Sequence, residues 1–436
     1  MKLQVFQSGK GDCLLLSSDD GHHVLVDGGM PASYSEHVSA ALGDMAKDGE
    51  ILDLVYVSHI DQDHIGGVLR LFDDIVAWRG FDFQRANGNP DFPPPRAPRP
   101  PKVGRVWHNA FAEQIGRNAG AIGNLLATTA QSLSGSSEAE WVATAEQHGE
   151  LATSVNEAIR LSRRLDSDHL GIPTNPDFGG RLAFVRPTVQ AVDLGSMRLT
   201  VIGPFAKDLR RLRKEWNEWL RKNEAALAKI SADAQRDASL LGANELDRVI
   251  FPLLKEAEAL GDRALVTAPN LASLMLLAEE GSHSVLLTGD GHATDIVAGL
   301  RAVGRLPAAK GLHVDVLKVQ HHGSEHNLDE AFCRRITADH YVFCGNGEHE
   351  NPDFGVVEAL VQSRLGPAGV RSANAEATRP FQLWFNSAPS ETEKPAAIAH
   401  MERLETLVSS LVATSGGQMS AHFLRDASSI VVPIAS

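Results

Sequence analysis

The residues best suited to chemistry lie in one short segment, residues 59–64, with the sequence HIDQDH. It follows the apolar run DLVYVS and precedes two glycines, which predicts a turn between a strand and a helix. Such a turn brings side chains together, here those of His59, Asp61, Asp63 and His64. Nitrogen and oxygen ligands in combination suit Zn²⁺, Mn²⁺ or Fe²⁺ better than Ca²⁺. The segment therefore predicts a metal site, with a solvated polar turn as the alternative interpretation.

Two later apolar runs end in groups of the same kind. The run LLTGD ends at Asp290, and VLKVQHHGS carries the neighbouring histidines His321 and His322. An isolated aspartate after Thr-Gly is more typical of a turn, and an isolated histidine pair is more typical of a surface. Because all three predicted strands end in potential ligands, we expect these groups to lie beside the first cluster.

The elements that must position these residues predict an α/β fold. Runs such as VLV and LVYV lack polar alternation, which is typical of buried strands. Helical patterns lie between several strands, so we expect two sheets flanked by helices. The core would span residues 1–365 and be interrupted by helical insertions at about 84–185 and 206–262, with a small strand and helix extension over 366–436.

Composition limits the classes of function. The chain has 436 residues, 43% of them hydrophobic, and can bury a large core. Lys and Arg total 41 against 55 Asp and Glu, and the net charge of −14 provides no overall positive field for nucleic acid. Three scattered cysteines are too few for a disulfide framework. No leader pattern and no apolar run of about 18 residues is present, so we expect a cytoplasmic protein without membrane contact.

Taken together, the motifs resemble a known family. VSHIDQDHIGG, LLTGD and LKVQHHGS, in that order after an early VLVDGG, are similar to those of the metallo-β-lactamase-fold hydrolases. They look most like the ComEC-like competence-type branch, which has HxDxDH where most of the superfamily has HxHxDH. With GKGDC near the start, the resemblance covers about residues 1–72, 190–204 and 264–365. It implies an αββα sandwich. Unlike the competence protein, this chain has no apolar run long enough to span a membrane, so we expect a stand-alone soluble enzyme.

The resemblance also implies two divalent metal ions, Zn or Mn, and their ligands. The implied ligands are His59 and Asp61 for the first metal, Asp63, His64 and His322 for the second, and Asp290 as the bridge.

Further residues are implied around these ligands. Asp27 of the DGG turn would orient a ligand imidazole by accepting its free N–H. His321 would contact the substrate or the leaving group. Lys318 and Ser324 would meet a phosphate, with a lysine that caps the core edge as the alternative.

One ligand position departs from the wider superfamily. The third histidine expected before the bridging aspartate is replaced within PNLAS, where Asn270 is the nearest candidate. Fewer ligands for the first metal favour a site that is weak or empty, completed by substrate or tuned to Mn²⁺. His108 is a candidate substitute, and His349 is a candidate border of the pocket. A hydrogen-bonded strand end and a surface loop are their respective alternatives.

The implied chemistry is hydrolysis by a metal-bound hydroxide. Asp63 or Asp290 would orient the hydroxide, and His321 would protonate the leaving group. The resemblance favours a phosphodiester as substrate, either a nucleic acid or a small molecule. The alternatives are a small-molecule lactam, lactone or thioester hydrolase, and a metal-stabilised binding or regulatory module whose helical insertions contact a partner protein.

Overall fold

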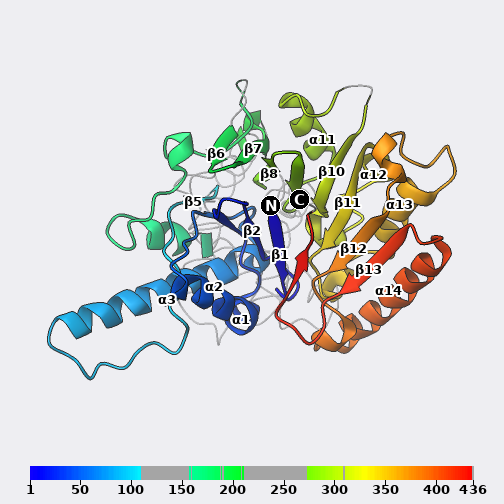
Figure 1. The fold of residues 1–436 in the computed structure, drawn as a ribbon. Helices are drawn as coiled ribbons and strands as arrows, with labels where there is room; N and C mark the ends of the chain where they lie inside the picture. Colours follow the sequence, from blue (N-terminus) through cyan, green and yellow to red (C-terminus); the bar gives the residue numbers. More distant parts are fainter. Residues whose placement is uncertain are drawn as a thin grey trace, which may run out of the picture.

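The computed structural model describes residues 1–109, 157–210 and 273–434, apart from residues 159, 187, 189–190, 208 and 308–309. Within these ranges the strands form two sheets. Figure 1 shows α2 and α3 beside the first sheet and α12, α13 and α14 beside the second. No helix in these ranges has the length and apolar character needed to cross a membrane.

The first sheet has six strands in the order β14-β1-β2-β3-β4-β5. Strands β1 to β3 form antiparallel hairpins, whereas β4 and β5 continue the sheet in parallel. The strands are β1 (Lys2–Phe6), β2 (Leu14–Ser17), β3 (His23–Val26), β4 (Leu54–Tyr56), β5 (Val106–Trp107) and β14 (Ser429–Val432).

The second sheet has eight strands in the order β13-β12-β11-β10-β9-β8-β7-β6. Strands β6 to β9 are antiparallel, and β9 to β13 are parallel. The strands are β6 (Ala191–Leu194), β7 (Met197–Gly203), β8 (Met275–Glu280), β9 (His283–Leu287), β10 (Leu312–Lys318), β11 (Ile336–Phe343), β12 (Phe381–Phe385) and β13 (Met419–Phe423).

Helices connect these strands. The longest described helix, α3, is the next element after β4, and its first turn carries the last three residues of the HIDQDH segment. The α-helices are α1 (Pro31–Ser33), α2 (Ser39–Lys47), α3 (Gln62–Ala86), α11 (Ala293–Ala302), α12 (Glu330–Arg335), α13 (Phe354–Leu365) and α14 (Pro395–Thr414). A π-helical turn, η1 (Tyr34–Val38), joins α1 to α2, and short 3₁₀ turns are η3 (Pro176–Phe178), η4 (Gln320–Gly323), η5 (Glu348–Glu350), η6 (Ala375–Thr378) and η7 (Pro389–Glu391).

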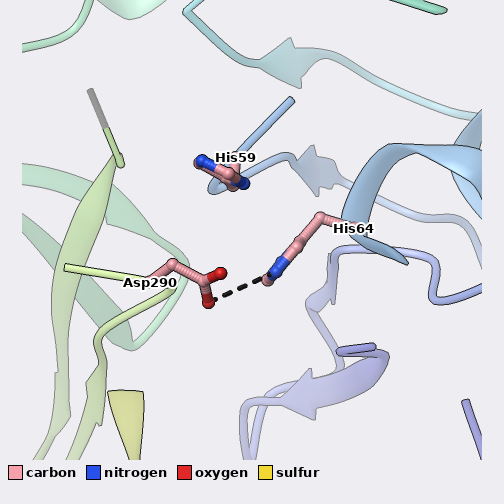
Figure 2. A group of neighbouring side chains, drawn as sticks. All are labelled: His59, His64 and Asp290. Carbon is pink, nitrogen blue, oxygen red and sulfur yellow. Dashed lines mark ion pairs between the residues drawn. The ribbon is translucent and has the colours of Figure 1, made fainter. Parts of the chain in front are cut away.

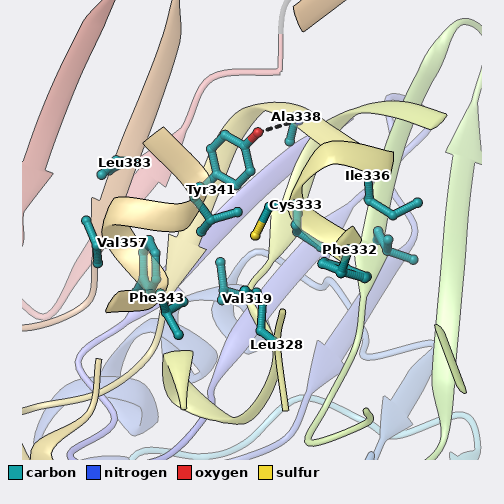
Figure 3. Close-up of a cluster of buried hydrophobic side chains, with 14 of the residues drawn as sticks. Val319, Leu328, Phe332, Cys333, Ile336, Ala338, Tyr341, Phe343, Val357 and Leu383 are labelled. Carbon is teal, nitrogen blue, oxygen red and sulfur yellow. Dashed lines mark hydrogen bonds between the residues drawn. The ribbon is translucent and has the colours of Figure 1, made fainter. Parts of the chain in front are cut away.

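Buried side chains form three hydrophobic layers, which follow from the alternation of strand side chains. On β3, Leu25 packs toward α2 and α3, whereas Val24 and Val26 pack between the sheets. A third layer, which includes Tyr341 and Phe332, fills the space between the second sheet and its helices (Figure 3). The order of layers is therefore helix, sheet, sheet, helix, and the expected αββα sandwich is confirmed.

The segment predicted as a C-terminal extension contributes strands to both sheets. Strands β12 and β13 pair beside β11, and β14 pairs with β1, where Leu3 lies opposite Val432. Figure 1 shows β14 in red next to the dark-blue β1. These strands are thus part of the two-sheet core. Much of both predicted insertions lies outside the described residues.

Candidate metal centre

The HIDQDH segment joins the end of β4 to the start of α3. Asp61 is the N-cap residue of α3, and Asp63 and His64 lie in its first turn. His59 and His64 are buried, with 3% and 0% exposure, whereas Asp61 is partly exposed. Because unpaired N–H groups give a helix N-terminus partial positive charge, this position also stabilises the Asp63 carboxylate.

The second sheet supplies the remaining groups at the ends of two parallel strands. Asp290 follows β9 after a turn in which Gly289 has a φ of 49°. His321 and His322 follow β10 and both have positive φ, 47° and 55°. Such backbone angles are uncommon for residues other than glycine, and they bend the chain so that both rings remain beside the strand end.

The side chains from the two sheets meet. His64 Nε2 lies 3.3 Å from Asp290 Oδ1, and His322 Nε2 lies 3.2 Å from Asp63 Oδ2. The His59 and His64 ring centroids are 5.3 Å apart. Figure 2 shows His59, His64 and Asp290 approaching one another from three different segments. The structure therefore brings together five of the six predicted metal ligands, namely His59, Asp63, His64, Asp290 and His322. Asp61 belongs to none of the ligand groups found among the described residues, and its Oδ2 atom lies 3.4 Å from His59 Nδ1.

Several polar atoms in this cluster are buried and have no hydrogen-bond partner. They are the Nε2 atoms of His59, His64 and His322 and the Oδ1 atom of Asp290. Buried polar atoms without partners cost free energy, and bound divalent cations would give them partners. Four groups have ligand atoms within 4.8 Å of one another: His59, His64 and Asp290; Asp63, His64 and His322; Asp12, Asp27 and His64; and Asp12, Asp290 and His322. The donor set fits a divalent metal ion with nitrogen and oxygen ligands.

The charges of the cluster hold its groups in opposite protonation states. Burial acts to raise the pKa of Asp290, but the charges of His64, His321 and His322 outweigh burial and lower it well below its ordinary range. Burial acts to lower the pKa of His322, but Asp290 and Asp12 are among the carboxylates that outweigh burial and raise it to about 10. An imidazole must lose its proton to bind a metal, so metal binding at this cluster is coupled to pH.

Asp27 lies behind His64, on the side away from Asp290. Its Oδ2 atom is 3.0 Å from His64 Nδ1, and its carboxylate accepts hydrogen bonds from Ser58 N at 2.7 Å and Ser58 Oγ at 2.5 Å. A carboxylate that accepts from Nδ1 fixes the tautomer in which Nε2 faces the metal. This is the contact that the sequence predicts for Asp27.

The two residues expected to meet a phosphate are buried. Lys318 is 1% exposed and forms an ion pair with Asp12, and Ser324 is 5% exposed. Neither side chain is presented to solvent, so the structure favours the alternative interpretation in which Lys318 belongs to the core edge.

His321 lies at the accessible side of the cluster. Its side chain is 29% exposed, and its Nε2 atom is 3.8 Å from Asp290 Oδ2. Its Nδ1 atom lies 2.6 Å from Oδ1 of Asn327, whose amide also donates to the Asp290 carbonyl. Burial lowers the pKa of His321. This geometry fixes the ring with Nε2 toward Asp290.

The remaining candidates lie elsewhere. Asn270 falls outside the described residues. His108 is buried, but it belongs to none of the ligand groups found among the described residues. His349 lies in the short turn η5, with its Nε2 atom 3.4 Å from Lys10 Nζ.

Sequence reasoning missed two acidic residues at the cluster. Asp12, 1% exposed, lies 3.2 Å from His322 Nδ1, and the motif GKGDC was the available signal for it. Glu157, 7% exposed, accepts from Gln62 Nε2 at 3.4 Å, and its Oε2 atom has no partner. Nothing in the sequence around Glu157 indicates that an inserted helix reaches the start of α3.

Part of the chain is similar to a known family of proteins. Residues 8–77 match the family model described as the metallo-beta-lactamase superfamily, and this range carries both HIDQDH and Asp27. No curated protein matches the sequence. Among solved structures, the chain is similar to a mutant of CmlA beta-hydroxylase, with 10% identity and a TM-score of 0.34 over 99% of this chain and 54% of that one. The chain thus spans about half the length of that protein.

Proposed function

We propose that this protein is a metal-dependent hydrolase of the metallo-β-lactamase superfamily that cleaves phosphodiester bonds. The observation that carries the proposal is the set of buried, unpartnered donor atoms on His59, His64, His322 and Asp290, contributed by both sheets. A divalent ion bound by these residues would supply a Lewis acid and lower the pKa of a coordinated water.

The residues of the chain have distinct parts in this chemistry. The carboxylates of Asp63 and Asp290 face the same space as the ligand imidazoles and can accept a proton from an attacking water. Asn327 Oδ1 accepts from Nδ1 of His321, and burial lowers the pKa of this ring, so its Nε2 atom carries a lone pair. Nε2 can therefore take up the proton released by the attacking water and then pass it to the leaving group. The side chains of His59, His64 and His322 are buried, so water is excluded from their side of the site.

The substrate class rests on the motifs. The HxDxDH pattern resembles the ComEC-like branch, which favours a phosphodiester, and nucleic acid is the substrate we propose. Because the net charge is −14, the metal ions and local groups would have to bind the phosphates. The burial of Lys318 and Ser324 removes two expected phosphate contacts, and this favours a small-molecule lactam, lactone or thioester as the second candidate.

Assays with Mn²⁺ and Zn²⁺ separate these candidates. We expect hydrolysis of bis-p-nitrophenyl phosphate and of linear DNA, with a KM for DNA that rises steeply with salt. Asp63→Ala and Asp290→Ala should abolish turnover while circular dichroism shows an intact fold, and the exposed Asp193→Ala should keep full activity. Turnover of a lactam without turnover of either phosphodiester would replace the proposed substrate, and full activity of Asp290→Ala would refute the site.

A further inference from the structure

Lys318 and Asp12 form an ion pair that is closed off from solvent. Each residue is 1% exposed. The Lys318 ammonium also donates to the Gly289 carbonyl oxygen at 3.3 Å. Burying two charges costs several kcal/mol, and an apolar pair of similar volume is often at least as stable. A role in stability is therefore a weak explanation for this pair.

The pair lies directly behind the metal centre. Asp12 Oδ1 is 3.2 Å from Nδ1 of His322, and Asp12 Oδ2 is 3.8 Å from Nδ1 of His64. The opposite nitrogens of these rings, the Nε2 atoms, face Asp63 and Asp290. Asp12 thus contacts the rear of two ligand imidazoles, and its Oδ1 atom, which has no hydrogen-bond partner, forms a charge contact with His322 Nδ1.

Backbone contacts join the pair to both ligand-bearing turns. Asp12 N donates to the Asp63 carbonyl at 3.2 Å. The approach is so close that a Cβ atom on Gly11 would lie 1.8 Å from the same oxygen. On the other sheet, the Gly289 carbonyl that accepts from Lys318 also accepts from His321 N at 3.1 Å. The pair therefore links the turn before Asp290 to the start of α3.

We propose that Asp12 and Lys318 are a positioning pair for the metal ligands. Lys318 neutralises Asp12 and holds its carboxylate in place, and Asp12 orients the His322 ring so that Nε2 faces Asp63. The Cys344 carbonyl, 2.7 Å from His322 Nδ1, shares this task. The inference rests on the proposed metal centre and assigns Lys318 to the protein interior and not to substrate binding.

The test is metal affinity in a variant that carries neither charge. Asp12→Asn combined with Lys318→Met avoids leaving a lone buried charge. We expect this double variant to fold, as judged by circular dichroism, and to bind Co²⁺ about 10- to 100-fold more weakly, with an altered d–d absorption spectrum. Excess Mn²⁺ should restore its hydrolysis of bis-p-nitrophenyl phosphate, whereas it should not rescue Asp290→Ala.

Two further variants keep the test decisive. Asp12→Glu keeps both charges of the pair but displaces the carboxylate from His322 Nδ1, and it should lose affinity in the same direction if the double variant does not fold. Arg364→Met is the matched control, because Arg364 is a buried cation, 2% exposed, bonded to Ala377 and Arg379 carbonyls. It should lose stability and keep the Co²⁺ spectrum.

The outcomes separate the two proposals. If the wild-type protein binds Co²⁺ and the folded double variant binds it within twofold, the positioning role is refuted and the metal centre stands. If the wild-type protein binds no divalent ion, the metal centre fails and the positioning role fails with it.

Discussion

His108, which follows β5, allows a quantitative test of how a buried histidine makes the stability of the fold depend on pH. It is 3% exposed, and its Nε2 atom has no hydrogen-bond partner. Its backbone is bonded to the Asn175 side chain, at 3.0 Å through N and 2.6 Å through O. Burial lowers the pKa of His108 from its ordinary 6.5 to about 4.

The sign of the pH effect follows from proton counting. Between pH 6.5 and pH 4 the unfolded chain holds a proton on His108 that the folded protein lacks, so stability falls as the pH falls through this range. A difference of about 2.5 in pKa corresponds to roughly 3 kcal/mol in the acid limit, and to about 2 kcal/mol at pH 5. This pH dependence is opposite to that of a histidine whose protonated form is stabilised by a carboxylate, because such a histidine contributes less stability as the pH rises.

Urea denaturation at pH 7.5 and pH 5 measures this contribution. In His108→Gln the loss of stability between the two pH values should be smaller than in the wild-type protein by about 2 kcal/mol. The exposed His326→Gln is the control and should follow the wild-type protein. Equal pH dependence in wild type and His108→Gln would refute the reasoning. Weaker metal binding by His108→Gln would instead assign His108 to the metal centre.

Three further perturbations test the site and its support. Asp27→Asn should weaken metal binding about 10- to 100-fold, measured by competition with a chelator, because asparagine tolerates the φ of 56° but its amide cannot hold His64 as the carboxylate does. Gly67→Ala should lower the free energy of unfolding by about 1–3 kcal/mol in urea, because its Cβ atom would lie 1.9 Å from the Gly28 carbonyl oxygen. Gly80→Ala on the same helix meets nothing within 4 Å and should be neutral or stabilising by up to about 1 kcal/mol. Excess chelator should lower the melting temperature, and Zn²⁺ or Mn²⁺ should restore it, because the unpartnered donors regain a cation; an unchanged melting temperature would contradict a resident metal.

Much of the cluster is predictable because its geometry is local. His59, Asp63 and His64 follow one strand, and the other groups follow β9 and β10, which run in parallel so that their carboxyl ends lie at the same edge. A polar residue directly after an apolar strand therefore lies at this edge of the sheet. The same logic predicts the two sheets and the helices that cover them.

The remaining features depend on pairings that sequence patterns do not encode. Strand β14 completes the first sheet by pairing with β1 from the far end of the chain, and an apolar run gives no sign of its partner. The family resemblance implies a phosphate contact for Lys318, with a lysine that caps the core edge as the alternative. Its burial is explained by Asp12, which lies in the loop between β1 and β2 of the other sheet and meets Lys318 only through tertiary packing.

The metal centre depends on the spacing between the two sheets. His59 and His64 extend from the first sheet, and Asp290 extends from the second. Leu274 connects the sheets directly, because its N–H donates to the Ser58 carbonyl at 2.8 Å and its carbonyl accepts from the Tyr56 hydroxyl. The side chains buried between the sheets fix the separation at which these bonds form. A metal ion requires its ligands at fixed distances. Because packing between the two sheets sets the distance between the sheets, it also sets the distance between the ligands, even where no core side chain touches a ligand.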